Sequence, residues 1–124
     1  MRTAAVAKEQ ASKEPEYENI KTGVGYENWV AKFENDVATQ LSSDGVTSMA
    51  YLLRRPNAPP LPPTATDHER RTRSAPHTGP AFEIDNTKLY RVLESVTIKE
   101  EQAYQFVRIY QSTKHGVNAW TAEI

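Results

Sequence analysis

The sequence predicts a mainly α-helical protein: a small helical bundle in two blocks, joined by a proline-rich linker and preceded by a disordered N-terminal arm. Apolar residues recur with helical spacing in two separate stretches, 26–55 and 81–124. Five of the eight prolines lie together between these stretches. Only 38% of the residues are hydrophobic and the mean hydropathy is -0.69, so the apolar content supports one small core with unpacked flanks.

Residues 1–25 are expected to form the flexible arm. Charged residues of both signs are interleaved here and Pro15 interrupts them, so no apolar face is wide enough to dock on a core. A contact with the rest of the chain is expected only from Tyr17 or Ile20. The glycines at 23 and 25 separate the arm from the first helix.

The first helical block, residues 26–55, is expected to begin with a helix over about 26–41. Its apolar side chains repeat every four residues, which places them on one slowly drifting helical stripe. Burial of Trp29 and Phe33 in this stripe stabilises the fold by roughly 1.5–3 kcal/mol each. This is the largest hydrophobic contribution in this half of the chain.

An Asp-Gly turn is expected to end this helix, because Gly45 can adopt the left-handed backbone conformation of a helix C-terminus or turn. A short helix, capped by Thr47 or Ser48, should follow. It must end before Pro56, because the residue that precedes a proline avoids helical geometry.

Residues 56–80 are expected to be a linker. Its first part, 56–63, should be extended polyproline II, and the remainder lacks periodicity apart from a helical turn expected near 66–73. Short proline motifs are common in spacers, but WW-type domains also bind them through aromatic grooves. The candidate partner motif is formed by Pro59, Pro60, Leu61 and Pro62.

Positive charge gathers around this linker. Between residues 54 and 73 there are five arginines and two acidic residues, a net charge of 5 − 2 = +3, whereas the whole chain carries -1. Such a segment can make weak, salt-sensitive contacts with phosphates, although arginines also serve to keep a linker solvated. The candidate RNA contacts are Arg54, Arg55, Arg70, Arg71 and Arg73.

The second helical block, residues 81–124, is expected to contain three helices. Asp85 is the expected N-cap of the first, a role worth about 1 kcal/mol over alanine. The second should span about 100–112 and end before Gly116. The third runs up to Ile124 without a stop signal, which predicts a chain cut inside a longer protein.

Apolar side chains of both blocks are expected to serve folding and self-association, so a homo-oligomer is the expected state. A linker of 25 residues permits the blocks to pack together or to remain apart with little entropic difference. The candidate packing residues are Trp29, Phe33, Val37, Leu41, Tyr51, Leu52, Leu89, Leu93, Phe106 and Trp120.

No pattern in the chain indicates catalysis. There is no cysteine, the three histidines lack metal-ligand spacing, and neither a nucleophile elbow nor a phosphate-binding glycine loop is present. We therefore expect no enzyme, cofactor, metal site or small-molecule substrate. No apolar run reaches membrane-spanning length and the N-terminus lacks the apolar core of a secretory signal. A cytoplasmic protein without membrane contact is expected.

A helix-turn-helix DNA reader over residues 85–120 is a further alternative. Its recognition helix should present arginines or asparagines on the outer face. Here Arg108, Lys114 and Asn118 are few and are opposed by four glutamates, which disfavours this function.

Several motifs follow one another in a set order: a tryptophan helix, an Asp-Gly turn, a Tyr-Leu-Leu-Arg run, a linker, an Asp-led helix and a late Gly-x-x-Ala-Trp. Their residues are Trp29, Leu41, Asp44-Gly45-Val46, Tyr51-Leu52-Leu53-Arg54, Gly79-Pro80, Asp85, Leu89-Tyr90, Leu93, Gly116 and Ala119-Trp120. Over about residues 26–124, this order and spacing resembles the Gag-like, capsid-like N-terminal region of Copia-type retrotransposon polyproteins.

The resemblance implies a helical Gag segment that self-associates into a particle shell around the RNA of the element. The family's zinc knuckle, protease, integrase and reverse transcriptase motifs are not in this sequence, so the resemblance implies a structural fragment. Similar proteins commonly have a basic residue after the late glycine, where this chain has Val117, so no RNA contact is expected there. The alternative from another class is an adaptor whose linker binds a WW-type partner.

Overall fold

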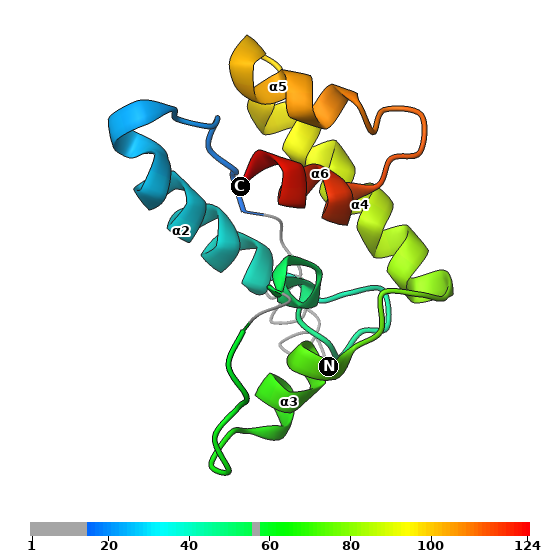
Figure 1. The fold of residues 1–124 in the computed structure, drawn as a ribbon. Helices are drawn as coiled ribbons and strands as arrows, with labels where there is room; N and C mark the ends of the chain where they lie inside the picture. The colour runs from blue at the N-terminus through cyan, green and yellow to red at the C-terminus, as the bar shows by residue number, and fades with distance from the viewer. Residues whose placement is uncertain (1–14, 56–57) are drawn as a thin grey trace, which may run out of the picture.

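The computed structural model describes residues 15–55 and 58–124, and over these residues the fold is mainly α-helical, as the sequence predicts (Figure 1). No β-strand occurs among them; the one β-type pairing is an isolated antiparallel bridge between Leu41 and Ser48. In chain order the elements are the 3-10 helix η1 (Gly23–Gly25), α2 (Tyr26–Ala38), the 3-10 helix η2 (Met49–Leu53), α3 (Asp67–Ser74), α4 (Pro80–Thr97), α5 (Glu101–Arg108) and α6 (Gly116–Glu123).

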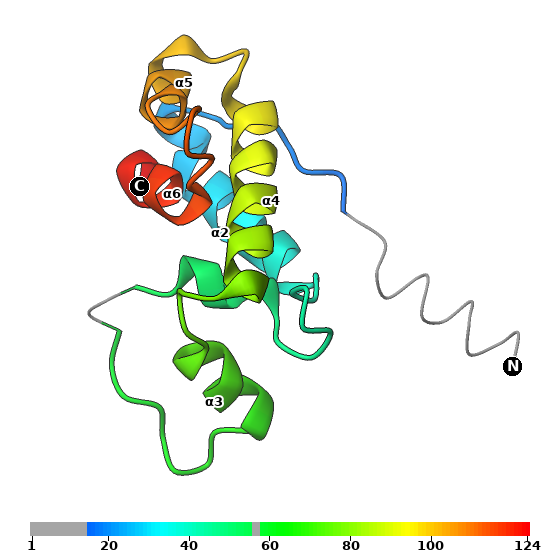
Figure 2. The same cartoon turned by 90° about the vertical axis from the view of Figure 1, so that its right-hand side faces the viewer.

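The two predicted helical blocks share one core. α4 packs against both α5 and α6, and η2 contacts α2, α3, α4 and α6 (Figures 1 and 2). At the centre, Phe33 of α2 stacks on Trp120 of α6 with ring centroids 5.1 Å apart, and Trp29 lies 6.4 Å from the same indole. Aromatic side chains, including both tryptophans of the chain, therefore join α2 to α6.

Within the described part of the predicted arm, residues 15–25, the contacts with this core come from around Tyr17 and Ile20, the two residues from which a contact is expected. Ile20 is buried, and its backbone N donates a 2.8 Å hydrogen bond to the carbonyl of Val96. The indole of Trp29 donates to the carbonyl of Glu18 at 2.9 Å, and Tyr17 contacts the ring of Phe33. A buried indole N–H needs an acceptor, and this segment supplies it. The remainder of the predicted arm, residues 1–14, lies outside the described residues.

The predicted linker contains α3 and folds back on η2. A capping box starts α3: the hydroxyl of Thr66 accepts from the backbone N of Glu69, whose carboxylate accepts from the backbone N of Thr66. This agrees with the helical turn expected near 66–73. Pro56 and Asn57, at the start of the predicted linker, lie outside the described residues.

The prediction that Asp85 caps the N-terminus of its helix is wrong. α4 begins at Pro80 rather than at Asn86, and its N-cap is Gly79, at φ +97°. Proline is favoured at the first position of a helix because its fixed φ suits the helix and its missing N–H would be unpaired there. Asp85 consequently lies inside α4, where only 2% of it is exposed.

Two candidate packing residues do not belong to the core. α2 ends at Ala38, so Leu41 falls beyond the helix and is 49% exposed. The chain leaves the helical path because the backbones of Gln40 and Met49 pair there. Phe106 lies on the outer side of α5 and is 41% exposed, while its neighbour Val107 is buried. The other eight candidates are buried.

Candidate functional site

The connection between α2 and η2 is a tight turn organised by the carboxylate of Asp44. Its Oδ1 accepts hydrogen bonds from the hydroxyl of Ser42 at 2.6 Å and from the backbone N of Val46 and of Thr47 at 2.8 Å. These donors, the Ser42 hydroxyl foremost, hold the pKa of Asp44 well below its ordinary value. Gly45 has a φ of +79°, the left-handed conformation that the sequence predicts for this turn.

Asp85 joins this turn and η2 to α4. Its Oδ1 accepts from the backbone N of Ser43 at 2.8 Å, and its Oδ2 accepts from the hydroxyl of Tyr51 at 2.6 Å. Burial, together with this hydrogen bond to a carboxylate, raises the pKa of Tyr51. The Asp-Gly turn, the Tyr-Leu-Leu-Arg run and the Asp-led helix thus meet at one buried carboxylate. Helical periodicity could not reveal this role, because Asp85 interrupts the apolar stripe of α4.

The Gly-x-x-Ala-Trp motif docks α6 against the backbone of α4. A Cβ atom at Gly116 would lie 2.4 Å from the carbonyl oxygen of Asn86 and 2.7 Å from the backbone N of Tyr90, so only glycine fits. The side chain of Asn86 accepts from the backbone N of Val117 at 2.8 Å and thereby satisfies one of the free N–H groups at the start of α6. Trp120, 2% exposed, then reaches the aromatic core.

Three of the five candidate RNA-contacting arginines bind backbone carbonyls of the folded linker. Arg54 donates to the carbonyls of Arg73 and Ala75, Arg73 donates to the carbonyl of Pro59, and Arg70 donates to two carbonyls before α3. These bonds hold the linker in place. Each guanidinium has five N–H donors and keeps its charge, and that of the exposed Arg70 can still face a phosphate, whereas Arg54 and Arg73 are half-buried.

The remaining two arginines are more open. Arg55 is exposed and its Nη2 lies 3.6 Å from a carboxylate oxygen of Glu34, whereas Arg71 is exposed on α3 and makes no hydrogen bond or ion pair through its side chain within the described residues. The structure therefore gathers four arginines around α3 and leaves Arg55 beside an acidic partner.

In the candidate partner motif, Pro59, Pro60 and Pro62 are exposed and Leu61 is half-buried. Leu61 lines a hollow of about 310 Å³ together with Ala50, Arg54 and side chains of α3. The proline rings thus face outward while the leucine points back toward the fold.

Two of the three histidines meet at one hollow, which the sequence did not indicate. His77 and His115 flank the ring of Phe82, with centroids 5.2 Å and 6.2 Å from it, and line a hollow of about 490 Å³. Both are engaged in the fold. The Nε2 of His77 lies 2.9 Å from the carbonyl of Tyr51, and the Nδ1 of His115 accepts from the backbone N of Asn118 at the start of α6.

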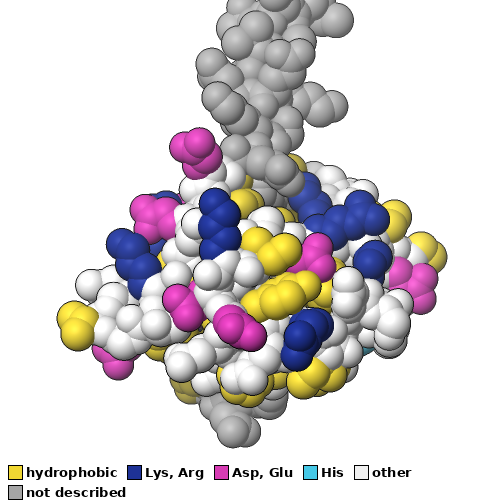
Figure 3. Space-filling model, turned by 90° about the horizontal axis from the view of Figure 1, so that it is seen from above, with side chains coloured by type: hydrophobic (Ala, Val, Ile, Leu, Met, Phe, Trp, Pro, Cys, Tyr) yellow, Lys and Arg dark blue, Asp and Glu magenta, His cyan; other side chains and the backbone are white. Residues whose placement is uncertain are grey.

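Exposed apolar side chains are spread over several elements. Figure 3 shows the end of the molecule that carries α5, where hydrophobic side chains lie among charged side chains of both signs. No single sign of charge dominates this face. Among the described residues, the large hydrophobic side chains that are exposed are Val24, Leu41, Val46, Ile84, Ile98, Phe106, Ile109 and Ile124.

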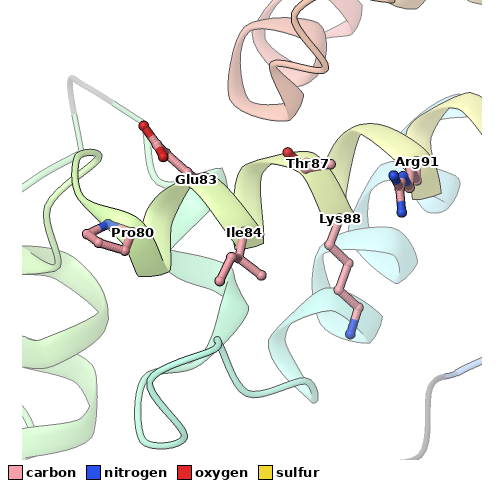
Figure 4. A pocket seen from close by; sticks show the side chains of 6 residues that line it. All are labelled: Pro80, Glu83, Ile84, Thr87, Lys88 and Arg91. Atoms are coloured by element: carbon pink, nitrogen blue, oxygen red, sulfur yellow. The ribbon is translucent and has the colours of Figure 1, made fainter.

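One of them, Ile84, lies on the outer face of α4. This face borders a shallow hollow of about 610 Å³, and Figure 4 shows Ile84 and Lys88 on one side of the helix with Glu83 and Thr87 on the other. The face belongs to α4, the longest helix of the described chain, and no other helix lies in front of α4 in the view of Figure 2.

Within the described residues, no group of three or more histidine, aspartate or glutamate side chains is placed to hold a metal ion. None of the described helices combines the length and the apolar character that crossing a bilayer requires. Comparison with known proteins found no matching family model, no significant match among curated proteins and no significant match among solved structures.

Proposed function

We propose that this chain is a noncatalytic, Gag-like structural protein of a Copia-type retrotransposon, which self-associates through its helices in the cytoplasm. The observation that supports the proposal best is the placement of the motif residues. Trp29, Asp85 and Trp120, far apart in sequence, all serve one buried framework. The motif residues therefore serve to hold the fold together and do not form a reaction site. A subunit of a protein shell needs a stable fold of this kind and no catalytic site.

The surface is consistent with assembly through several weak contacts. Exposed apolar side chains such as Ile84, Phe106 and Ile109 lie on or beside α4 and α5. Contacts between such single side chains are weak for one pair of molecules and become strong only when many copies assemble. Subunits of a reversible shell need contacts of this strength.

RNA binding is the weaker part of the proposal and rests on the arginines around α3. Their guanidinium groups are spread over the folded linker, where Asp67 and Glu69 reduce their net charge. Binding should therefore be weak and should fall steeply as salt is raised, because it depends on the release of counterions.

Self-association is tested by sedimentation of the full chain over a wide range of protein concentration, at low and at high salt. We expect the weight-average mass to rise with concentration under both conditions, because exposed apolar side chains contribute to the contacts and salt does not screen them. A chain that remains monomeric at the highest concentration, at both salt levels, contradicts the proposal.

The exposed rings of Pro59, Pro60 and Pro62 support a second candidate, an adaptor whose linker binds a WW-type domain. Titration of the full chain with a purified WW domain tests it. Binding should be lost in Pro62→Ala and retained in Pro76→Ala, which changes an exposed proline outside the motif. Equal binding by the two variants, or none by the unmodified chain, excludes this candidate.

A further inference from the structure

The outer face of α4 carries charges of opposite sign at its two ends. Glu83 lies near the N-terminal end and Arg91 two turns later, with Thr87 midway between them at the same helical spacing of four. Glu83 and Arg91 are exposed, and neither side chain has an ion pair or hydrogen bond within the part of the chain that the structure describes. Ile84, 60% exposed, adds an apolar side chain beside this row.

Along the row of Glu83, Thr87 and Arg91 the order of charges is self-complementary, whereas Lys88 lies beside this row, on the side of Ile84 (Figure 4). We propose that the outer face of α4 pairs with the same face of a second copy of the chain, antiparallel, about a two-fold axis at Thr87. In that arrangement a residue faces the residue of the second copy that lies equally far from Thr87 on the other side, so the two numbers sum to 174. Each Glu83 therefore meets Arg91 of the second copy, and this ion pair forms twice. A parallel pairing would instead set glutamate against glutamate and arginine against arginine.

Packing favours the same arrangement. Thr87 is small and half-buried, so it lets the two helices approach at the axis. By the same rule Ile84 faces position 90 of the second copy, between the exposed side chains of Lys88 and Arg91, whose aliphatic stems can cover it and remove apolar surface from water. Antiparallel helices also align their dipoles favourably.

The inference rests on the proposed self-association and names its surface. One helix face is smaller than a standard protein–protein interface of about 1,600 Å², so the contact is a weak dimer. Such a dimer suits a subunit that must also use other contacts in an assembly.

Charge reversal in the full chain tests the pairing. Glu83→Arg sets arginine against arginine and Arg91→Glu sets glutamate against glutamate. We expect each single change to weaken dimerisation, measured by sedimentation equilibrium at low salt, by about tenfold or more. The double change Glu83→Arg/Arg91→Glu recreates both ion pairs with reversed polarity and should recover most of the affinity. A merely structural role for either residue would not give this recovery.

The matched control is Glu101→Arg/Arg108→Glu, with its two single changes, on the exposed side of α5. These variants carry the same alterations of charge and should dimerise as the unmodified chain does. If the unmodified chain self-associates but the single changes on α4 have no effect, or if the double change is as weak as the singles, the α4 pairing is overturned while self-association stands. A chain that is monomeric throughout overturns both.

A cysteine at the axis provides an independent test, because the chain has none of its own. Two helices packed with axes roughly 8–10 Å apart bring facing Cα atoms within reach of a disulfide. Thr87→Cys should therefore form a covalent dimer rapidly under mild oxidation, whereas Lys99→Cys, exposed beyond the end of α4, should not. Equal rates of cross-linking at the two positions contradict the pairing.

Discussion

Asp85 is buried inside α4, yet its carboxylate binds two groups from the other half of the chain. A buried carboxylate is tolerated only where donors replace its water, and here the backbone N of Ser43 and the hydroxyl of Tyr51 do so. The stability of the junction between the Asp44 turn and α4 therefore depends on these two hydrogen bonds.

Tyr51→Phe should lower the free energy of unfolding by roughly 1–3 kcal/mol, because it leaves a buried carboxylate oxygen without its donor while the ring still fills its place. Urea unfolding followed by circular dichroism measures the loss. Tyr110→Phe removes a hydroxyl from a half-buried tyrosine and should have little effect. Equal losses in the two variants would show that the hydrogen bond to Asp85 does not stabilise the fold.

The environment of Glu123 predicts that the stability of the fold depends on pH between acid and neutral conditions. Burial raises the pKa of its carboxyl from 4.5 to about 7, and Oε2 has no hydrogen-bond partner within the described residues. Between these two pKa values the folded chain holds a proton that the unfolded chain releases. Glu123 therefore lowers stability as the pH rises from 4.5 toward 7, and the full penalty is present above pH 7.

Glu123→Gln removes this penalty. The variant should have a higher thermal midpoint than the unmodified chain at pH 8, and the difference should shrink toward zero near pH 4.5. Glu101→Gln, at an exposed position on α5, should show no such trend. A difference between Glu123→Gln and the unmodified chain that is the same at both pH values would mean that the carboxyl is not protonated preferentially in the folded state.

Among the helices, α6 packs very closely against α4. The first residue of α6 is Gly116, and any larger side chain at this position would collide with the backbone of α4. The contact uses the backbone of Asn86 and Tyr90, which cannot move aside without distorting α4. Backbone approach of this kind, rather than a left-handed turn, explains the glycine of the late motif.

Gly116→Ala should therefore displace α6 and lower the free energy of unfolding by roughly 1–3 kcal/mol or more. Gly25→Ala is the matched control, because the new Cβ there meets side-chain atoms of the exposed Lys21, at 3.1 Å or more, and no backbone atom. Chemical denaturation of the two variants checks this. If Gly116→Ala costs no more than Gly25→Ala, the close approach of α6 to α4 is not tight in solution.

The sequence predicted helices best where an apolar stripe defined them. The stripe of α2 is buried at Trp29, Phe33 and Val37, but no stripe could show that the helix stops before Leu41, because that stop depends on backbone pairing with the segment after the turn. The start of α4 had two possible signals in the sequence. Asp85 is a favourable N-cap and Pro80 is a favourable first residue, and in the structure the helix begins at the proline.

For the whole molecule, what the sequence could not settle was the relation between the two blocks. Periodicity describes the buried face of a single helix but not its partner, so the contact of Phe33 with Trp120 could not be derived from spacing. The candidate arginines were recognisable by type, whereas their bonds to linker carbonyls depend on how the linker folds. The sequence pattern did not predict the exposed face of α4, because Ile84 lies outside the apolar stripe that marks the buried side of this helix.

A core shared by both blocks predicts one cooperative unfolding transition. Tryptophan fluorescence reports on the Trp29–Trp120 contact between the blocks, and far-ultraviolet circular dichroism reports on all helices, so the two signals should change together. Phe33→Leu loosens the stack on Trp120 and should lower the stability seen by both probes equally, by roughly 1–2 kcal/mol. Val24→Ala, at a fully exposed position, is the control. Fluorescence that changes at a lower urea concentration than circular dichroism would mean that the blocks separate before their helices unfold, and that they are two folding units joined by a weak contact.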